Sequence, residues 1–132
     1  MLNLHAPFRR AASGDEARIA KLTGSGTASL ESTVVADEAS GITAVLSGRP
    51  EGETWRIATL AVAPDRRDQL APRILAIADA LAADDGILSV TLDPAGLGNE
   101  MLAILDQEGF RQADGAGQGG SPRLIRPVVP QG

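Results

Sequence analysis

Residues 55–92 read WRIATLAVAPDRRDQLAPRILAIADALAADDGILSVTL. Residues 55–63 become apolar on both faces toward their end, which is typical of a central strand that is covered on both sides. From about residue 68 to residue 84, apolar residues recur at helical spacing, and Gly86 ends this pattern. Residues 87–92 are a second apolar run of strand length. The stretch therefore predicts a strand, a helix and a strand, with the two strands parallel and joined by a right-handed crossover.

The sequence on either side of this unit predicts shorter elements. Ser13 and Glu16 have the spacing of a capping box, which predicts that a helix begins there. A further helix is indicated at 97–108, because apolar residues again share one side. The predicted strands are 4–12, 30–36, 42–46, 123–129 and a short one after Phe110, with turns or loops at 37–41, 49–53 and 115–120. This order predicts an α/β (α+β) fold, a single domain over residues 1–132 whose mixed sheet carries helices on both faces.

The predicted core combines the strongest apolar positions of these elements. On strands they lie where both faces should be covered, and on helices they lie along the apolar stripe. We expect these side chains to be nearly buried: Ile57, Leu60, Val62, Ile74, Leu81, Val90, Leu92 and Phe110.

Composition excludes several kinds of site. The 132 residues include no cysteine, which excludes disulfides and thiolate metal sites. The single histidine, His5, leaves too few residues for a histidine-rich metal site or a Ser-His triad, and we expect no metal. The formal net charge is −5 and aromatic residues are scarce, which argues against a nucleic-acid partner. No apolar run is long enough to span a membrane, so we expect a cytoplasmic protein without a membrane partner. Much arginine and little lysine are typical of GC-rich bacterial genomes.

Several segments match one known family in the same order. Residues 57–67, IATLAVAPDRR, resemble that family's fourth strand and the start of its coenzyme loop. Residues 99–110 resemble its fourth helix, which commonly ends in Gly-Phe, and residues 9–22 resemble its opening segment. Nearly the whole chain is in this way similar to the GNAT superfamily of N-acyltransferases. The resemblance implies transfer of an acetyl or acyl group from acyl-CoA to a primary amine.

The resemblance also implies where the coenzyme lies. In this family the fourth and fifth strands splay apart, and their unpaired backbone groups bind the pantetheine arm. The loop after the fourth strand and the helix behind it direct N–H groups at the diphosphate. The positions implied to bind acetyl-CoA or CoA are Leu60, Val62, Arg66, Arg67, Gln69, Ala71, Arg73 and Asn99. An alternative role for Asn99 is to cap its helix.

The coenzyme loop departs from the family pattern Arg/Gln-x-x-Gly-x-Gly/Ala. Leu70 and Pro72 stand at the two small-residue positions, and Asp68 adds a negative charge. Proline has no N–H, so a candidate phosphate donor is lost, and we expect weak coenzyme binding that glycine at both positions would improve. The arginines at 66, 67 and 73 either compensate through their side chains or are solvated and paired with Asp65 and Asp68.

The catalytic groups depart from the family pattern as well. Leu105 stands where many members place a tyrosine that protonates the leaving thiolate, and the chain has no tyrosine. Asp93 and Glu53 are the candidate general bases that can accept the proton of the amine. Each has a structural alternative, Asp93 as a turn residue before Pro94 and Glu53 as a solvated loop charge.

The sequence leaves two main functions open, with coenzyme sensing as a third. One is acyl transfer, and the other is a catalytically inactive GNAT-like module that acts through a protein partner. Residues 23–28 stand where the family usually has a helix that walls the acceptor site. We therefore expect the amine-acceptor site to be open, or to be completed by a partner chain such as a second copy in a homo-oligomer.

Overall fold

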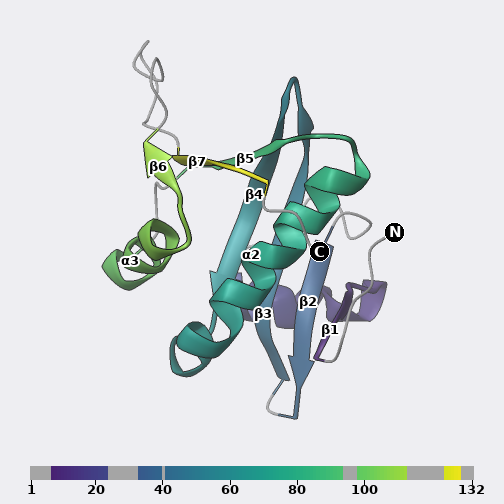
Figure 1. Cartoon of the computed structure of the whole chain (residues 1–132). Helices are drawn as coiled ribbons and strands as arrows, with labels where there is room; N and C mark the ends of the chain where they lie inside the picture. Colours follow the sequence, from purple (N-terminus) through teal and green to yellow (C-terminus); the bar gives the residue numbers. More distant parts are fainter. Residues whose placement is uncertain (1–6, 24–32, 40, 94–97, 113–123, 129–132) are drawn as a thin grey trace.

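The structure is a computed structural model that describes residues 7–23, 33–39, 41–93, 98–112 and 124–128. Its strands form a seven-stranded sheet in the order β1-β2-β3-β4-β5-β7-β6 (Figure 1). The predicted loop at 115–120 and the short segment after residue 23 lie outside the described residues. The elements are β1 (Phe8–Arg10), the 3-10 helix η1 (Ser13–Asp15), α1 (Glu16–Thr23), β2 (Thr33–Glu38), β3 (Gly41–Glu51), β4 (Thr54–Val62), the 3-10 helix η3 (Pro64–Arg66), α2 (Arg67–Asp84), β5 (Ser89–Leu92), α3 (Asn99–Gln107), β6 (Arg111–Gln112) and β7 (Leu124–Pro127).

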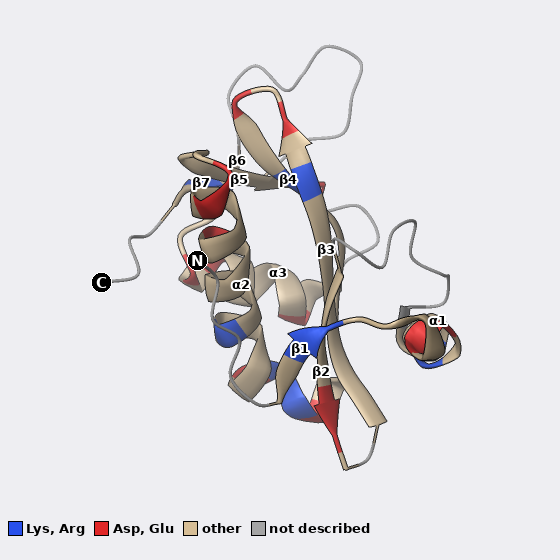
Figure 2. Cartoon of the chain, turned by 90° about the vertical axis from the view of Figure 1, so that its right-hand side faces the viewer, with Lys and Arg blue, Asp and Glu red and all other residues tan. Residues whose placement is uncertain are grey.

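The predicted parallel pair within the sheet is confirmed. Residues Trp55–Ile57 of β4 lie opposite Val90–Leu92 of β5 in parallel register. The other neighbouring strands in the described residues pair in antiparallel fashion, so the sheet is mixed. Helices α2 and α3 cover one face of the sheet and α1 covers the other, as predicted (Figure 2).

Two apolar layers hold the helices to the sheet. Because side chains alternate across a strand, Val34 of β2 belongs to the layer under α2 and α3, and Val35 belongs to the layer under α1. The expected core residues are buried with the exception of Leu60 and Leu81. The prediction was wrong for these two, which are only partly buried against the larger layer. For Leu81 the reason is that the fully buried stripe of α2 passes through Ala82 instead.

The capping box predicted at Ser13 and Glu16 is displaced by one residue. The carboxylate of Asp15 accepts a hydrogen bond from the N–H of Ala12 at 2.8 Å, and Ser13 is the first residue of η1 rather than its cap. Asp15 is buried and accepts a hydrogen bond from Arg9 of β1 at 2.7 Å, which holds the pKa of its carboxyl well below the usual range. Local spacing misplaced the cap because the deciding partner comes from a neighbouring strand.

Strand β3 is longer than the sequence predicts, because it extends to Glu51 instead of ending at Leu46. Residues 49–51, which were expected in a turn, pair with Thr54–Arg56 of β4. The turn itself narrows to Gly52 and Glu53, and the φ of Gly52 is 63°, a conformation that favours glycine. Pairing between the two strands therefore overrides the local turn signal.

Gly48 of β3 lies where the ladder with β4 changes register. The shift falls between Ser47 and Gly48, which leaves Ala58 of β4 as the extra residue of a β-bulge. A Cβ atom at Gly48 would lie 2.4 Å from ring atoms of Trp55, whose side chain is buried. The buried tryptophan therefore requires glycine at this position.

Replacing Gly48 with alanine should lower the free energy of unfolding by about 1–3 kcal/mol, the usual cost of overpacking a core. The carbonyl oxygen of Arg56 would also lie 2.5 Å from the new Cβ, so movement of the Trp55 ring alone does not relieve the clash. Urea denaturation measures the change. Gly14→Ala is the matched control, because nothing lies within 4 Å of a Cβ there. Equal stability of the two variants would contradict the close approach of Trp55.

Candidate functional site

Strands β4 and β5 separate after a short parallel contact. β5 ends at Leu92, opposite Ile57, while β4 continues from Ala58 to Val62. Beyond the bulge at Ala58, the backbone groups of β4 that point toward β5 have no strand partner among the described residues. We call this segment, residues 58–62, the open β4 edge, and Leu60 and Val62 of the predicted coenzyme site lie on it. An extended polar chain can bind such an edge in the manner of an added strand.

Helix α2 begins at the carboxyl end of β4, directly after η3. The N–H groups of Arg67, Asp68 and Gln69 have no carbonyl four residues earlier within the helix, so they are suited to receive an anion. The helix dipole adds positive potential at the same end. The open β4 edge therefore leads to a helix N-terminus of the kind that binds phosphate.

The residues at the motif positions face the core rather than this N-terminus. Leu70 and Ala71 lie in the first turns of α2 but are fully buried in the larger apolar layer, so their side chains point into the core and away from an anion at the helix N-terminus. Pro72 lies inside α2, and the N–H that it lacks would pair with the carbonyl of Asp68 within the helix. Contrary to the sequence prediction, Pro72 removes a helix hydrogen bond and not a phosphate donor.

Arg66, the last residue of η3, forms an ion pair with a carboxylate on strand β2. Its Nε and Nη2 atoms donate to the two carboxylate oxygens of Glu38 on β2, at 2.9 and 2.7 Å. The hydroxyl of Thr43 on β3 donates to the same carboxylate at 2.6 Å. The Arg66 guanidinium, assisted by Thr43, holds the pKa of the Glu38 carboxyl below its ordinary value, and Glu38 in turn raises the pKa of Arg66. A further hydrogen bond joins Arg66 to the side chain of Gln69.

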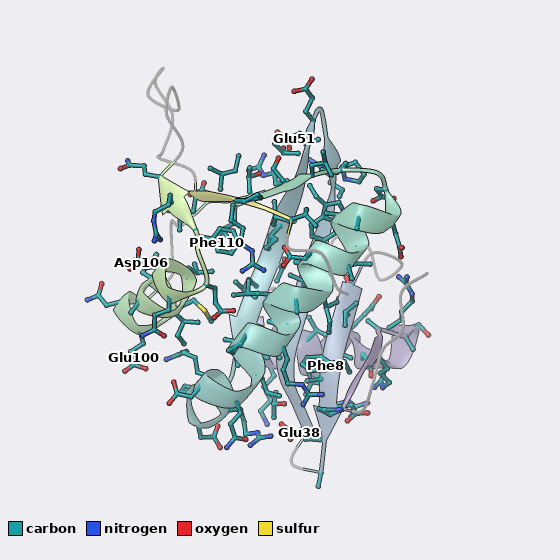
Figure 3. The ribbon with its side chains drawn as sticks, in the orientation of Figure 1. Phe8, Glu38, Glu51, Glu100, Asp106 and Phe110 are labelled. Atoms are coloured by element: carbon teal, nitrogen blue, oxygen red, sulfur yellow. The ribbon has the colours of Figure 1, made fainter. Side chains whose placement is uncertain are left out.

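Arg67, the first residue of α2, is held by a carboxylate from α3. Its Nη1 atom donates to Glu100 at 2.5 Å. The Arg67 side chain is 20% exposed and that of Glu100 is 80% exposed. The Nε atom of Arg67 is buried and has no hydrogen-bond partner among the described residues. Figure 3 shows Glu38 and Glu100 on either side of the first turns of α2, so a carboxylate flanks the helix start on each side.

Arg73 contacts an aromatic ring. Its guanidinium carbon lies 4.9 Å from the centre of the Phe8 ring, a cation–π contact between α2 and β1. The ion-pair partners of Arg66 and Arg67 are Glu38 and Glu100 rather than Asp65 and Asp68, which corrects that alternative from the sequence. Arg66 and Arg67 are therefore paired with carboxylates of other elements, whereas Arg73 contacts Phe8 and remains exposed to solvent.

The two candidate general bases lie at opposite ends of β5. Asp93 directly follows this strand, at the end where β4 and β5 part. Glu53 lies in the turn before β4, where the hydroxyl of Ser89 donates to its carbonyl at 3.5 Å. At about 3.3 Å per residue, the length of β5 separates the two positions by about 13 Å. Both residues are exposed, and the structure does not bring them together.

Helix α3 carries the other two positions that the family resemblance singles out. Asn99 is the first residue of the helix and Gly98 is its N-cap, so Asn99 does not cap it. Asn99 is exposed, next to Glu100. Leu105 is fully buried in the larger apolar layer, and its side chain has no group that can donate a proton.

Sequence reasoning missed a buried ion pair between α2 and β7. Arg126 donates to Asp79 at 2.5 Å, and both residues are almost fully buried. The guanidinium also donates to the carbonyl oxygens of Leu75 at 3.1 Å and Glu108 at 2.7 Å, and it lies 4.9 Å from the centre of the Phe110 ring. The signal in the sequence was an aspartate on the apolar side of one helix and an arginine inside an apolar strand.

Other features of the described residues do not add to this site. A pocket of about 300 Å³ lies between α1 and β3, on the sheet face away from α2, and is lined by Arg18, Lys21, Leu22, Gly41 and Ile42. Within the described ranges there is no group of three or more side chains that could ligate a metal. No helix there is both long enough and apolar enough to cross a bilayer.

The fold has known counterparts, although no protein-family model and no curated protein matches the sequence. One counterpart is N-acetylglutamate synthase of Neisseria gonorrhoeae complexed with coenzyme A and N-acetyl-glutamate, with a TM-score of 0.75 and 18% identity, covering 98% of this chain and 36% of that chain. Another is the PaiA N-acetyltransferase of Thermoplasma acidophilum in complex with coenzyme A, with a TM-score of 0.73 and 12% identity, covering 91% of this chain and 97% of that chain.

A third counterpart is an acetyltransferase of the GNAT family from Staphylococcus aureus, with a TM-score of 0.74 and 9% identity, covering 92% of this chain and 98% of that chain. The chain spans about a third of the length of the synthase chains that it matches. The structural counterparts and the splayed β4–β5 pair agree: the chain has the fold of the GNAT acetyltransferases.

Proposed function

We propose that this chain is an N-acyltransferase of the GNAT type, which transfers an acetyl or acyl group from acyl-CoA to a primary amine. The observation that carries the proposal is the open β4 edge, which leads to the N-terminus of α2. Counterparts of the same fold are complexed with coenzyme A, which supports this class of coenzyme.

The residues present fit part of this coenzyme. An extended pantetheine chain matches the backbone groups of the open β4 edge, and a diphosphate matches the N–H groups at 67–69. The charged side chains fit the diphosphate less well. Arg66 and Arg67 already pair with carboxylates, and Asp68 places a negative charge at the same helix end, where it would repel the diphosphate. A helix N-terminus stabilises a bound anion by only about 0.3–1 kcal/mol. We therefore expect the coenzyme to bind weakly.

The coenzyme would supply a thioester, and the chain has to position its carbonyl carbon and receive a proton. The amine nitrogen attacks that carbon, the C–N bond forms, and the C–S bond breaks to release a thiolate. The proton from the nitrogen passes through water to Asp93, which follows β5 at the end where β4 and β5 part. Glu53 lies at the other end of β5, so Asp93 is the base that we propose. Leu105 cannot protonate the sulfur, so the thiolate leaves unaided and transfer is slow.

A second function is favoured by the pairing of the arginines. Glu38 and Glu100 already pair with Arg66 and Arg67, so both of these cations are neutralised without a ligand. The chain would then be a catalytically inactive module that acts through a protein partner or through a second copy of itself. Coenzyme binding distinguishes the two functions.

Acetyl-CoA should bind the 132-residue chain with a Kd of about 10⁻⁴ M or weaker, because backbone donors are present but the arginines are occupied. Isothermal titration calorimetry with acetyl-CoA and with CoA measures the affinity. Arg67→Ala should weaken binding by about tenfold or more, since a hydrogen bond to a charged group is worth about 1.5–3 kcal/mol. Arg111→Ala is the matched control, because Arg111 lies on β6 and pairs with Asp106.

Two outcomes would decide between the functions. Absence of binding at millimolar acetyl-CoA would sink the acyltransferase proposal and leave the partner-binding module. If acetyl-CoA binds, release of free thiol in the presence of primary amines tests transfer. Asp93→Asn should then lower the transfer rate by about 10²-fold or more with an unchanged Kd, as expected for a general base.

A further inference from the structure

The ion pair between Arg67 and Glu100 joins the starts of two helices. Arg67 is the first residue of α2, which follows β4, and Glu100 lies in the first turn of α3, which is the next helix after β5. β4 and β5 have parted at this end of the sheet, so the pair connects the two sides across the end of the open β4 edge. The contact is 2.5 Å long, and Figure 3 shows Glu100 on α3 near the first turn of α2.

We propose that Glu100 competes with the coenzyme diphosphate for Arg67, so that coenzyme binding requires this ion pair to break. The inference rests on the proposed function, because it assigns the diphosphate to the N-terminus of α2. It makes Glu100 a residue that lowers coenzyme affinity, and it explains weak binding by a group outside the coenzyme loop.

The burial of the two partners shows which of them moves. The Arg67 side chain is 80% buried by the fold, since it is 20% exposed, whereas Glu100 is 80% exposed and reaches the guanidinium from solvent. Glu100 can therefore turn away while Arg67 stays in place. The pair occupies Nη1 of Arg67, the atom that Glu100 reaches from solvent, whereas Nε is buried and has no partner among the described residues. A phosphate that replaced Glu100 would offer its acceptor oxygens to the same accessible side of the guanidinium.

The neighbouring pair between Arg66 and Glu38 does not behave in this way. Glu38 is 22% exposed and Arg66 is 30% exposed. Two parallel hydrogen bonds join them, and Thr43 donates a third to the carboxylate. This contact is bidentate and anchored to two strands, so it fixes the turn after β4. Glu100 is thus the carboxylate at the start of α2 that an anion can displace.

The test compares Glu100→Gln with Asp106→Asn. Both residues lie on α3, both are strongly exposed, and both changes remove one negative charge. Glu100→Gln should bind CoA about two- to fivefold more tightly than the unmodified chain, the range that an exposed ion pair supports. Asp106→Asn should leave the Kd for CoA unchanged, because Asp106 pairs with Arg111. In an Arg67→Ala background, Glu100→Gln should give no gain, since the group in competition is absent.

Calorimetry with CoA separates failure of this inference from failure of the proposed function. If the unmodified chain binds CoA and Glu100→Gln binds it equally or less tightly, the competition is refuted and the acyltransferase proposal stands. A gain in CoA affinity that persists in the Arg67→Ala background, or that Asp106→Asn reproduces, would show a general charge effect and would also refute the competition. If the unmodified chain and all the variants fail to bind CoA, both proposals fall.

Discussion

Replacing Arg126 with alanine should lower the free energy of unfolding by about 3–5 kcal/mol, the cost of leaving a buried charge without its partner. Asp79 is 1% exposed, so its carboxylate cannot recover hydration when the guanidinium is removed. The carbonyl oxygens of Leu75 and Glu108 lose a donor at the same time. Because Glu108 lies just after α3 and Arg126 lies on β7, one side chain ties α2, α3 and the sheet together.

A matched set of variants separates charge from packing at this pair. Asp79→Ala should lower the free energy of unfolding by as much as Arg126→Ala, because it leaves the buried Arg126 guanidinium without its carboxylate. The double variant Asp79→Leu with Arg126→Met should recover most of the loss, since apolar pairs of similar volume replace buried ion pairs at little cost. Urea denaturation at constant pH measures all three. If Arg126→Ala costs less than about 1 kcal/mol, the guanidinium is not buried as described.

Elements with a local sequence pattern were predicted correctly, whereas features that depend on long-range pairing were missed. The strand–helix–strand unit at 55–92 was predicted correctly because each of its elements has its own periodicity, and the crossover rule then fixes the parallel pairing. The extra length of β3 was missed because it depends on the partner strand. Leu81 has the right spacing for the buried stripe but lies at its edge, which only the packing of α2 on the sheet decides.

The candidate site shows the same division. The end of β4 and the presence of a helix behind it are local, and the sequence predicted both. The coenzyme loop expected at the motif positions 67–72 is instead the first part of α2, so that prediction was wrong. The partners of the arginines are not local: Glu38 is 28 residues from Arg66, and Glu100 is 33 residues from Arg67. In a sequence, the neighbouring acids Asp65 and Asp68 are the obvious candidates, and only the packing of β2 and α3 around the start of α2 brings Glu38 and Glu100 close.

The motif position at residue 70 provides the other large expected effect. The sequence predicts that glycine at positions 70 and 72 together improves coenzyme binding, but Leu70 is fully buried in the larger apolar layer under α2. Truncating a buried leucine costs about 2–5 kcal/mol, and glycine in a helix interior adds about 1 kcal/mol. Leu70→Gly should therefore lower the free energy of unfolding by about 3–6 kcal/mol and should not strengthen acetyl-CoA binding, because it changes the core and not the N–H groups at 67–69.

Pro72→Ala is the informative control for Leu70→Gly. It restores the N–H that pairs with the carbonyl of Asp68 and relieves the clash of the ring with that carbonyl, so it should raise the free energy of unfolding by about 1–3 kcal/mol. Leu70→Gly and Pro72→Ala should thus shift the free energy of unfolding in opposite directions, since Leu70 fills the core and Pro72 interrupts the helix hydrogen bonds. Chemical denaturation and calorimetry with acetyl-CoA measure both variants. If Leu70→Gly kept the stability of the unmodified chain and bound acetyl-CoA more tightly, residue 70 would face the coenzyme, and the position of α2 on the sheet described here would be wrong.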